Sequence, residues 1–266
     1  MTQASPIDIP LLVKLYNERH TFKQLEKLLH ADYRRLSSIL TDAGVSVRSR
    51  TSKYFCNEHA FDTLSPEVEY WLGFLLTDGC IYDPGKRTPR IELRLAEIDK
   101  EHIEAFKQFL NSSTPLIFHK KQKAWSLIVP SALLVTKLAQ YGIVPRKTYI
   151  QQHVPSALKL SPHFWRGVID GDGCIHTTQR HRVTLVSANH LLLEDFVAYV
   201  RSVEPNTSRG TPFTGNLTNC HGAAKTVSIL TFTAQRLLNV LYANGISLPR
   251  KLLKAREFGG VLCTKV

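Results

Sequence analysis

Residues 65–81, SPEVEYWLGFLLTDGCI, return in a shorter form as residues 161–175, SPHFWRGVIDGDGCI. Both stretches start with Ser-Pro, which is typical of a helix N-cap followed by proline in the first turn. Both then carry a Trp, a Gly two positions later, and Asp-Gly-Cys-Ile at the end. The same offset separates the two tryptophans and the two aspartates, Asp78 and Asp172. One unit therefore occurs twice in this chain, and we expect a molecule with pseudo-two-fold symmetry.

The residues downstream of the two stretches also match. Residues 138–147, LAQYGIVPRK, correspond to residues 241–251, LYANGISLPRK. In the first half, residues 90–96 alternate between apolar and charged side chains, as in a strand with one buried face, and a helix is expected after Asp99. The second half has the same order, with an added insert rich in Gly, Asn and Thr at about residues 205–224. The pattern predicts an α+β fold.

The composition favours a polyanionic partner. The chain has 34 basic and 22 acidic residues, a formal net charge of +12. An excess of this size attracts polyanions over a long range, although a basic protein that ignores nucleic acid stays an alternative. Five cysteines without a Cys-x-x-Cys pair indicate free thiols in a reducing compartment. The start has no signal-peptide pattern, and the apolar run Tyr70–Leu76 is too short to span a bilayer. We expect no membrane contact and a place in the cytoplasm of a bacterial or phage system, or in an organelle that has its own genome.

The two repeated stretches resemble the signature of the LAGLIDADG homing endonucleases. Residues 71–79, WLGFLLTDG, and 165–173, WRGVIDGDG, match the nine-residue motif in type at most positions. The resemblance covers about residues 65–260, most of the chain. It implies two αββαββα units whose sheets form one saddle across the DNA major groove, with the two motif helices packed side by side. The sequence departs from the motif at two positions. Leu76 replaces the first acidic residue of the motif, whereas Asp170 keeps it in the second copy. Arg166 replaces a small residue, and we expect its side chain to face away from the helix interface.

Small residues explain how two such helices can pack closely. Gly73 and Thr77 lie four residues apart, as do Gly167 and Gly171. Pairs at this spacing share one helix face and form a flat stripe on which two backbones can approach each other. Each helix is then followed by a glycine that suits a left-handed C-terminal position, Gly79 or Gly173.

This helix geometry brings Asp78 and Asp172 to the same end of the pair. Two carboxylates at the negative ends of helix dipoles repel each other, so a divalent cation with oxygen ligands is the fitting counter-charge. The resemblance implies that Asp78 and Asp172 are catalytic metal-binding acids, one per DNA strand, with Gly79 and Gly173 assigned to the same metal sites. Mg²⁺ or Mn²⁺ is the expected cofactor, and Ca²⁺ is expected to bind without supporting cleavage.

The family also uses one basic residue in each active site, which helps to polarise water or offsets phosphate charge. Near the end of each repeat, after Gly-Ile, the matching residues are Lys147 and Lys251. Three other lysines compete for this role on the sequence alone, namely Lys120, Lys121 and Lys225.

The first fifty residues are a different kind of segment. Helical spacing predicts helices at residues 9–18, 22–29 and 33–43, with Leu25, Leu28 and Leu29 of the second facing inward. The last two resemble a helix-turn-helix, and a small helical bundle that serves as a lid or a dimer contact is the alternative. Residues that suit DNA contacts lie on the outer face of the last helix and in a basic linker: Arg34, Arg35, Ser38, Thr41, Arg48, Arg50 and Lys53.

The function that these features favour is a monomeric endonuclease that makes metal-dependent double-strand breaks in a long, asymmetric DNA site. The expected domains are residues 1–50, a linker 51–64, and two repeated units, 65–160 and 161–266. A regulator that binds DNA without cutting it and an intron maturase that also binds intron RNA are the alternatives; the retained aspartates favour cutting. Candidates for base contacts on the polar strand faces are Arg90, Glu92, Arg94, Lys121, Gln179, Arg180, Arg182 and Lys225.

Overall fold

The computed structural model describes residues 7–18, 20–45, 47, 54–85, 88–178, 181–203, 218–219 and 224–263. The chain divides into an N-terminal unit, Met1–Cys56 with Asn111–Thr114, and a main unit, Asn57–Leu110 with Pro115–Val266. Most of the predicted insert lies outside the described residues, as do five of the predicted DNA contacts, Arg48, Arg50, Lys53, Gln179 and Arg180. Among the described helices, none is both long and apolar enough to cross a membrane.

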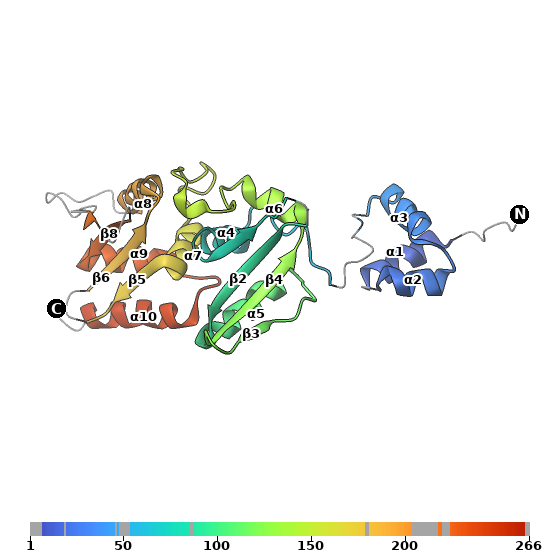
Figure 1. Ribbon diagram of the computed structural model, residues 1–266. Coiled ribbons are helices and arrows are strands. Elements are labelled where there is room, and N and C mark those ends of the chain that lie inside the picture. The colour runs from blue at the N-terminus through green and yellow to red at the C-terminus, as the bar shows by residue number, and fades with distance from the viewer. Residues whose placement is uncertain are drawn as a thin grey trace, which may run out of the picture. The chain divides into compact units, whose positions relative to one another are not determined.

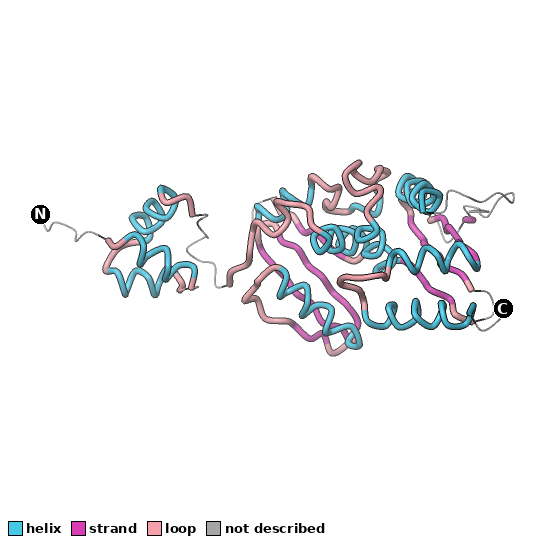
Figure 2. The backbone as a smooth tube through the Cα atoms, turned by 180° about the vertical axis from the view of Figure 1, so that it is seen from behind, coloured by secondary structure: helices cyan, strands magenta, loops and turns pink. Residues whose placement is uncertain are grey.

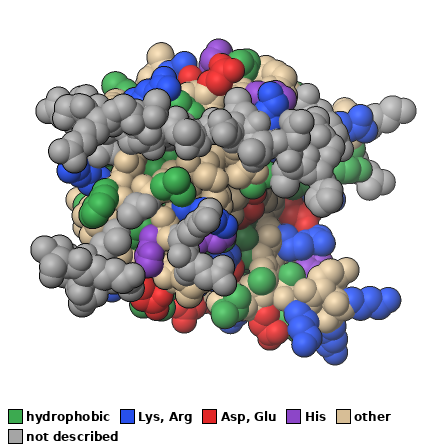
Figure 3. Space-filling view, turned by 90° about the vertical axis from the view of Figure 1, so that its left-hand side faces the viewer, with side chains coloured by type: hydrophobic (Ala, Val, Ile, Leu, Met, Phe, Trp, Pro, Cys, Tyr) green, Lys and Arg blue, Asp and Glu red, His purple; other side chains and the backbone are tan. Residues whose placement is uncertain are grey.

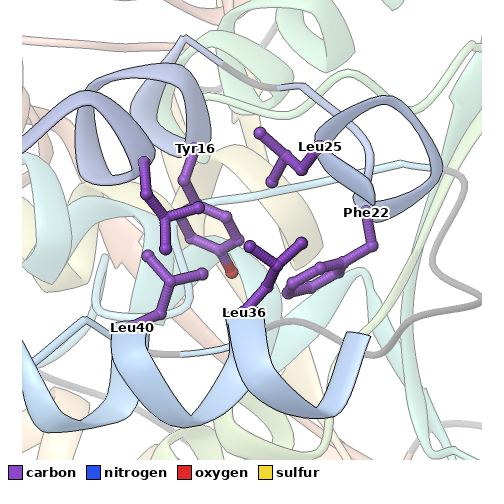
Figure 4. Packing of buried hydrophobic residues seen from close by; sticks show 6 residues of the cluster. Tyr16, Phe22, Leu25, Leu36 and Leu40 are labelled. Atoms are coloured by element: carbon purple, nitrogen blue, oxygen red, sulfur yellow. The ribbon is translucent and has the colours of Figure 1, made fainter. Parts of the chain in front are cut away.

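The N-terminal unit contains three short helices, α1 (Ile9–Asn17), α2 (Phe22–Leu29) and α3 (Tyr33–Asp42). A side chain caps the start of each helix by accepting from a backbone N–H, and in α2 the backbone N–H of the cap residue Thr21 donates to the Gln24 side chain in return. The three helices pack against each other around a small apolar cluster (Figure 4), which comprises Leu12, Tyr16, Phe22, Leu25, Leu36 and Leu40.

The prediction that the Leu28 side chain faces inward is wrong. Leu28 is 54% exposed, whereas Phe22 at the first position of the same helix is buried. Phe22 packs between Tyr16 and Tyr33, with ring centroids 5.7 and 4.7 Å away. The buried face of α2 is therefore formed by Phe22 and Leu25, and Leu28 lies outside it.

The first half of the main unit has the expected αββαββα order. Its elements are α4 (Pro66–Thr77), β1 (Gly79–Tyr82), β2 (Arg90–Ala96), α5 (Lys100–Phe109), β3 (Ile117–His119), β4 (Ala124–Pro130) and α6 (Ala132–Ala139). The strands form an antiparallel sheet in the order β1-β2-β4-β3. Helices α5 and α6 cover the face of this sheet that carries Ile91, Leu93 and Leu95 (Figure 2).

The second half repeats this order and adds a helix. Its elements are α7 (Pro162–Asp172), β5 (Gly173–His176), β6 (Arg182–Ser187), α8 (His190–Val203), β7 (Thr218–Asn219), β8 (Lys225–Leu230), α9 (Thr231–Leu241) and α10 (Pro249–Cys263). The sheet order, β5-β6-β8-β7, is the same as in the first half. The duplicated α+β fold is therefore confirmed. The long α10 was not anticipated. The equivalent residues of the first half form only a 3₁₀ turn, Lys147–Tyr149.

Helices α4 and α7 pack side by side at the centre of the main unit, with one sheet on either side (Figure 1). The predicted stripe of small residues forms their contact. A Cβ atom on Gly73 would lie 2.1 Å from the Phe164 carbonyl oxygen, and one on Gly167 would lie 2.2 Å from the Tyr70 carbonyl oxygen. Only glycine lets the two backbones approach this closely.

The substitution Gly167→Ala is expected to destabilise the main unit by about 3 kcal/mol or more, because its methyl group would force the two helices apart. The control is Gly85→Ala, at an open position with φ +71°, which should cost only the strain of that conformation, about 1 kcal/mol. Urea denaturation of both variants measures the difference. Equal losses in the two variants would show that close backbone approach is not what Gly167 provides.

The glycines that follow the motif helices do not have the predicted conformation. Gly173 has φ −77° and ψ 157°, an extended backbone, and Gly79 is the first residue of β1. Their role is a matter of space, because a Cβ atom would lie 2.6 Å from the Leu75 carbonyl oxygen at Gly79 and 2.7 Å from the Ile169 carbonyl oxygen at Gly173. In each half, the backbone thus passes directly from the motif helix into the next strand and packs against the last turn of that helix.

Candidate functional site

The two motif aspartates lie where α4 and α7 end. Asp78 is the C-cap residue of α4, and Asp172 is the last residue of α7. Gly171 precedes Asp172 in the chain, and a Cβ atom added to it would lie 3.3 Å from Asp78 Oδ2. The packing of the helix pair therefore brings the end of α7 against the Asp78 carboxylate, as the repeat predicts.

The two carboxylates are held in an unfavourable setting. Burial and the charge of Asp172 raise the pKa of Asp78 to about 6, although Lys251 and Lys147 oppose the shift. Burial likewise raises the pKa of Asp172, again against the same two lysines. Negative charge at this point is thus only partly compensated by the protein, and a cation would relieve it.

The predicted lysines also reach this site, one from each half. The Lys147 Nζ donates to the Gly79 carbonyl oxygen. The Lys251 Nζ donates to the Gly173 carbonyl oxygen at 2.5 Å. Each lysine therefore binds the residue that follows the aspartate of its own half.

The lysines differ in how firmly they are held. Lys251 is 5% exposed and also donates to the Ile169 and Gly171 carbonyl oxygens, at 2.7 and 3.2 Å. Lys147 is half-buried. Burial lowers the pKa of both amines, that of Lys251 to about 8, while the acidic groups around them oppose the shift. A weakly acidic ammonium group beside a carboxylate pair can offset the charge of a phosphate and take part in proton transfer.

The oxygen atoms of this site suit a hard divalent cation. Mg²⁺ is bound in proteins by one or two carboxylates together with water and substrate phosphate oxygens. Asp78 and Asp172 supply two carboxylates, and each neighbouring glycine carbonyl keeps a second lone pair beside its lysine. In the part of the chain that the structure describes, no group of three or more His, Cys, Asp or Glu residues forms a metal cluster. A metal held by the two aspartates would take further ligands from water or from a bound substrate.

A buried polar network behind the site was not anticipated. Asp170 is fully buried and accepts from the hydroxyl groups of Tyr242, at 2.6 Å, and Tyr70, at 2.9 Å. The Leu248 N–H also donates to it, at 2.6 Å. Burial raises the pKa of Asp170 to about 6 in spite of these three hydrogen bonds. Since Tyr70 belongs to α4, its hydrogen bond to Asp170 links the two motif helices. The only sign of this link in the sequence is that Asp170 is acidic where the equivalent residue, Leu76, is apolar.

His102 extends this network within the first half. Its Nε2 lies 2.8 Å from the Tyr70 hydroxyl oxygen. Because that hydroxyl donates its proton to Asp170, a neutral His102 must donate Nε2–H to it. Burial, together with the charge of Arg250, lowers the pKa of His102 to about 4.

His102 should make the main unit sensitive to acid. Its pKa is lower in the folded than in the unfolded chain, so the unfolded chain binds the proton first, and stability is lost as the pH falls from about 6.5 to about 4. The loss from this group approaches about 3 kcal/mol. We expect His102→Gln to lose correspondingly less stability than the parent between pH 7 and pH 4 in urea titrations. Equal losses for the two proteins would contradict the assignment.

The Arg166 side chain binds the end of α9 and the loop that follows it. The side chain is 1% exposed and donates to the carbonyl oxygens of Leu241, Asn244 and Ile246, at 2.7, 2.6 and 2.7 Å. It therefore caps the C-terminal end of α9 and holds the loop before α10. The expectation that it points away from the interface is wrong in part, because its guanidinium carbon also lies 5.4 Å from the centroid of the Tyr70 ring on α4.

Three of the four predicted DNA contacts of the first half share one sheet face. Arg90, Glu92 and Arg94 alternate along β2 with the buried residues, and Glu92 accepts from Arg94 at 2.6 Å. Arg90 lies over the Tyr82 ring, 4.4 Å from its centroid. Lys121 is exposed in the turn between β3 and β4.

The second half brings together fewer of the predicted contacts. Arg182 is the first residue of β6, on the face opposite Val183 and Leu185. Lys225 is the first residue of β8 and alternates onto the same face as Val227 and Ile229, so the structure does not place it beside Arg182. Figure 3 looks onto this end of the main unit, where the described basic side chains are interspersed with acidic ones. In the N-terminal unit, Arg34, Ser38 and Thr41 are exposed on α3, and Arg35 is partly exposed.

Comparison with known proteins identifies the fold family. No protein-family model matches the sequence, and the search of curated proteins found no match. Among solved structures, the LAGLIDADG meganuclease I-AabMI bound to uncleaved DNA is 15% identical, with 75% of this chain and 91% of that chain covered and a TM-score of 0.53. The LAGLIDADG homing endonuclease I-SmaMI bound to cleaved DNA is 12% identical, with coverages of 76% and 89% and a TM-score of 0.51. A variant of I-DmoI in complex with its nicked target DNA in the presence of manganese is 18% identical, with coverages of 72% and 99% and a TM-score of 0.50. This chain has the fold of the LAGLIDADG homing endonucleases.

Proposed function

We propose that this chain is a DNA endonuclease that makes a metal-dependent double-strand break in a long, asymmetric duplex. The observation that carries the proposal is that one aspartate and one lysine from each half meet at one end of the helix pair, where Lys147 and Lys251 both act on the charges of Asp78 and Asp172. A purely structural helix interface has no need of two carboxylates and two amines gathered at its end, with one of the amines, that of Lys251, buried. The structures with this fold named above are complexes with DNA, which supports the choice of substrate.

The metal-binding residues in this proposal are Asp78 and Asp172, with the carbonyl oxygens of Gly79 and Gly173 next to them. A bound Mg²⁺ or Mn²⁺ would lower the pKa of water and stabilise the leaving oxygen of a phosphodiester. The carboxylates hold the negative charge that attracts the cation, Asp78 from a half-buried and Asp172 from an exposed position. Lys147 and Lys251 each present an ammonium group to the phosphate of one strand and offset its charge as the bond breaks.

The DNA-binding surface in this proposal combines the polar face of the first sheet, which bears Arg90, Glu92 and Arg94, with that of the second sheet, which bears Arg182, and is extended by Lys121. The two halves carry different residues at equivalent positions, so the target should be asymmetric. We assign residues 65–160 and 161–266 to the two repeated units of a monomer, and residues 1–50 to an accessory helix-turn-helix that contacts DNA through α3.

The proposal is tested by separating binding from cutting. A pool of long random duplexes is bound to the protein in Ca²⁺, and the retained duplexes are recovered, sequenced and then transferred to Mg²⁺. We expect enrichment of one extended sequence that stays intact in Ca²⁺ and is cut in both strands in Mg²⁺. Enrichment without any cutting in Mg²⁺ or Mn²⁺ would instead identify a DNA-binding regulator.

A further inference from the structure

The two active-site lysines belong to equivalent positions of the repeat, but different structures support them. Lys251 lies in the first turn of α10, where its backbone N–H donates to the Leu248 carbonyl oxygen at 2.9 Å. Its Nζ has three carbonyl acceptors. Lys147 lies in a single 3₁₀ turn that starts after Arg146, a non-glycine residue at φ 57°, and its Nζ donates to one carbonyl. The lysine of the second half is therefore held by a long helix, and that of the first half by a short turn.

The start of α10 is bound to α7 by the Asp170 carboxylate. The Leu248 N–H, just before the first residue of α10, donates to Asp170 Oδ2 at 2.6 Å. The Tyr242 hydroxyl, just after α9, donates to Oδ1 at 2.6 Å. One fully buried side chain thus holds both ends of the loop that leads into α10. A hydrogen bond to a buried carboxylate is stronger than one between neutral groups, so this loop is tightly fixed.

The same helix end holds the lysine itself. The carbonyl oxygens that accept from Lys251 belong to Ile169, Gly171 and Gly173, which surround Asp170 in the chain. Backbone and side chain of one turn of α7 therefore bind both the amine and the helix that carries it. The equivalent residue of the first half is Leu76, whose side chain has no atom that can accept a hydrogen bond.

We propose that Asp170 is a positioning residue that orients Lys251 through the start of α10, and that this device exists in the second half alone. The inference rests on the proposed function, because it concerns how that active site is arranged. Its consequence is an enzyme with one active site that is ordered before DNA binds and another that depends more on DNA to order its lysine. Loss of Asp170 should therefore slow the cutting of one strand and spare the other.

A loosened α10 need not unfold the second half. Arg166 holds the carbonyl oxygens of Leu241, Asn244 and Ile246 independently of Asp170. Arg250 in the first turn of α10 binds Asp99 through its Nε, at 3.0 and 3.1 Å from the two carboxylate oxygens. These contacts do not involve Asp170, so the expected effect of replacing it is a displacement of Lys251 rather than loss of the fold.

The test compares three variants on a target duplex whose two strands carry different labels. Asp170→Leu introduces the residue of the first half, Asp170→Asn keeps an oxygen for the Leu248 N–H, and Tyr242→Phe removes a hydroxyl donor but leaves the Leu248 bond. Lys251→Met identifies the strand that depends on Lys251. On that strand we expect Asp170→Leu to cut about 10- to 100-fold more slowly, as when a supporting residue of an active site is lost. Asp170→Asn should fall between Asp170→Leu and the parent, Tyr242→Phe should stay close to the parent, and the other strand should change little in all three.

A second measurement keeps the inference testable without cleavage. Hydrogen exchange of the Leu248 amide, measured on the protein alone, should be faster in Asp170→Leu than in the parent and nearly unchanged in Tyr242→Phe. Equal slowing of both strands, or a parental exchange rate at Leu248, would overturn the inference. If Asp170→Leu does not fold, the same criteria apply to Asp170→Asn. If the parent itself cuts neither strand, the proposed function fails, while the exchange rate still decides whether Asp170 anchors α10.

Discussion

Replacing Asp78 and Asp172 together by asparagine is expected to abolish cleavage of both strands, a loss of about a thousandfold or more. Asparagine keeps the shape of the side chain and removes the charge that attracts a divalent cation. Because the folded protein raises the pKa of both carboxylates, their ionised forms oppose folding at neutral pH, so the double variant should fold at least as stably as the parent without metal. Labelled duplex in Mg²⁺ gives the cleavage rates, and thermal unfolding in EDTA gives the stability.

The control for this variant is Glu104→Gln, which neutralises a partly exposed carboxylate on α5 that pairs with Lys100. It should cut at the parental rate and lose little stability. Binding of the double aspartate variant to the selected duplex should persist, because the proposed DNA contacts lie on other residues. Cleavage at a rate near that of the parent would remove Asp78 and Asp172 from the chemistry.

Lys251→Met and Lys147→Met are each expected to slow the cutting of one strand by about a hundredfold, and each should act on a different strand. Methionine keeps most of the buried stem and removes the amine that donates to Gly173 or Gly79. Cleavage on strand-labelled duplex, with saturating protein, separates this effect from a loss of affinity. Nicked product from each variant should accumulate on opposite strands.

The matched control is Lys121→Met, at an exposed lysine between β3 and β4. A phosphate contact made there should weaken binding and reduce its dependence on salt, without favouring either strand in the cleavage step. If Lys121→Met instead reproduced the strand-specific defect, or if Lys147→Met slowed both strands equally, the assignment of one lysine to each strand would be wrong.

The repeat made the central part of the site predictable. Asp78 and Asp172 occupy equivalent positions in two copies of one motif, and small residues at a spacing of four required close helix packing. Alternation and capping, which are local patterns, predicted strands around a helix in each half, and the order αββαββα was implied by the resemblance to the LAGLIDADG family. The lysines could be picked out because Gly-Ile marks the same place in both halves, although three other lysines competed on equal terms.

The buried network could not be predicted from the sequence, for physical reasons. The contacts of Asp170 with Tyr70, Tyr242 and Leu248 join residues that are distant in the chain, and no local pattern encodes such hydrogen bonds. The departure Leu76 marked the position without showing what Asp170 binds. Likewise, the conformation of Gly173 was mistaken because a glycine after a helix usually serves a left-handed cap, whereas here it avoids a clash with the Ile169 carbonyl.

The account is tested most directly by mapping the ends that the parent protein produces on the selected duplex in Mg²⁺ and in EDTA. Sequencing both strands at single-nucleotide resolution shows where each phosphodiester bond is broken. Two active sites at one end of the helix pair predict a single cut at a fixed position in each strand, made in Mg²⁺ and absent in EDTA. Intact duplex in Mg²⁺, nicks scattered along both strands, or cuts that persist in EDTA would contradict it.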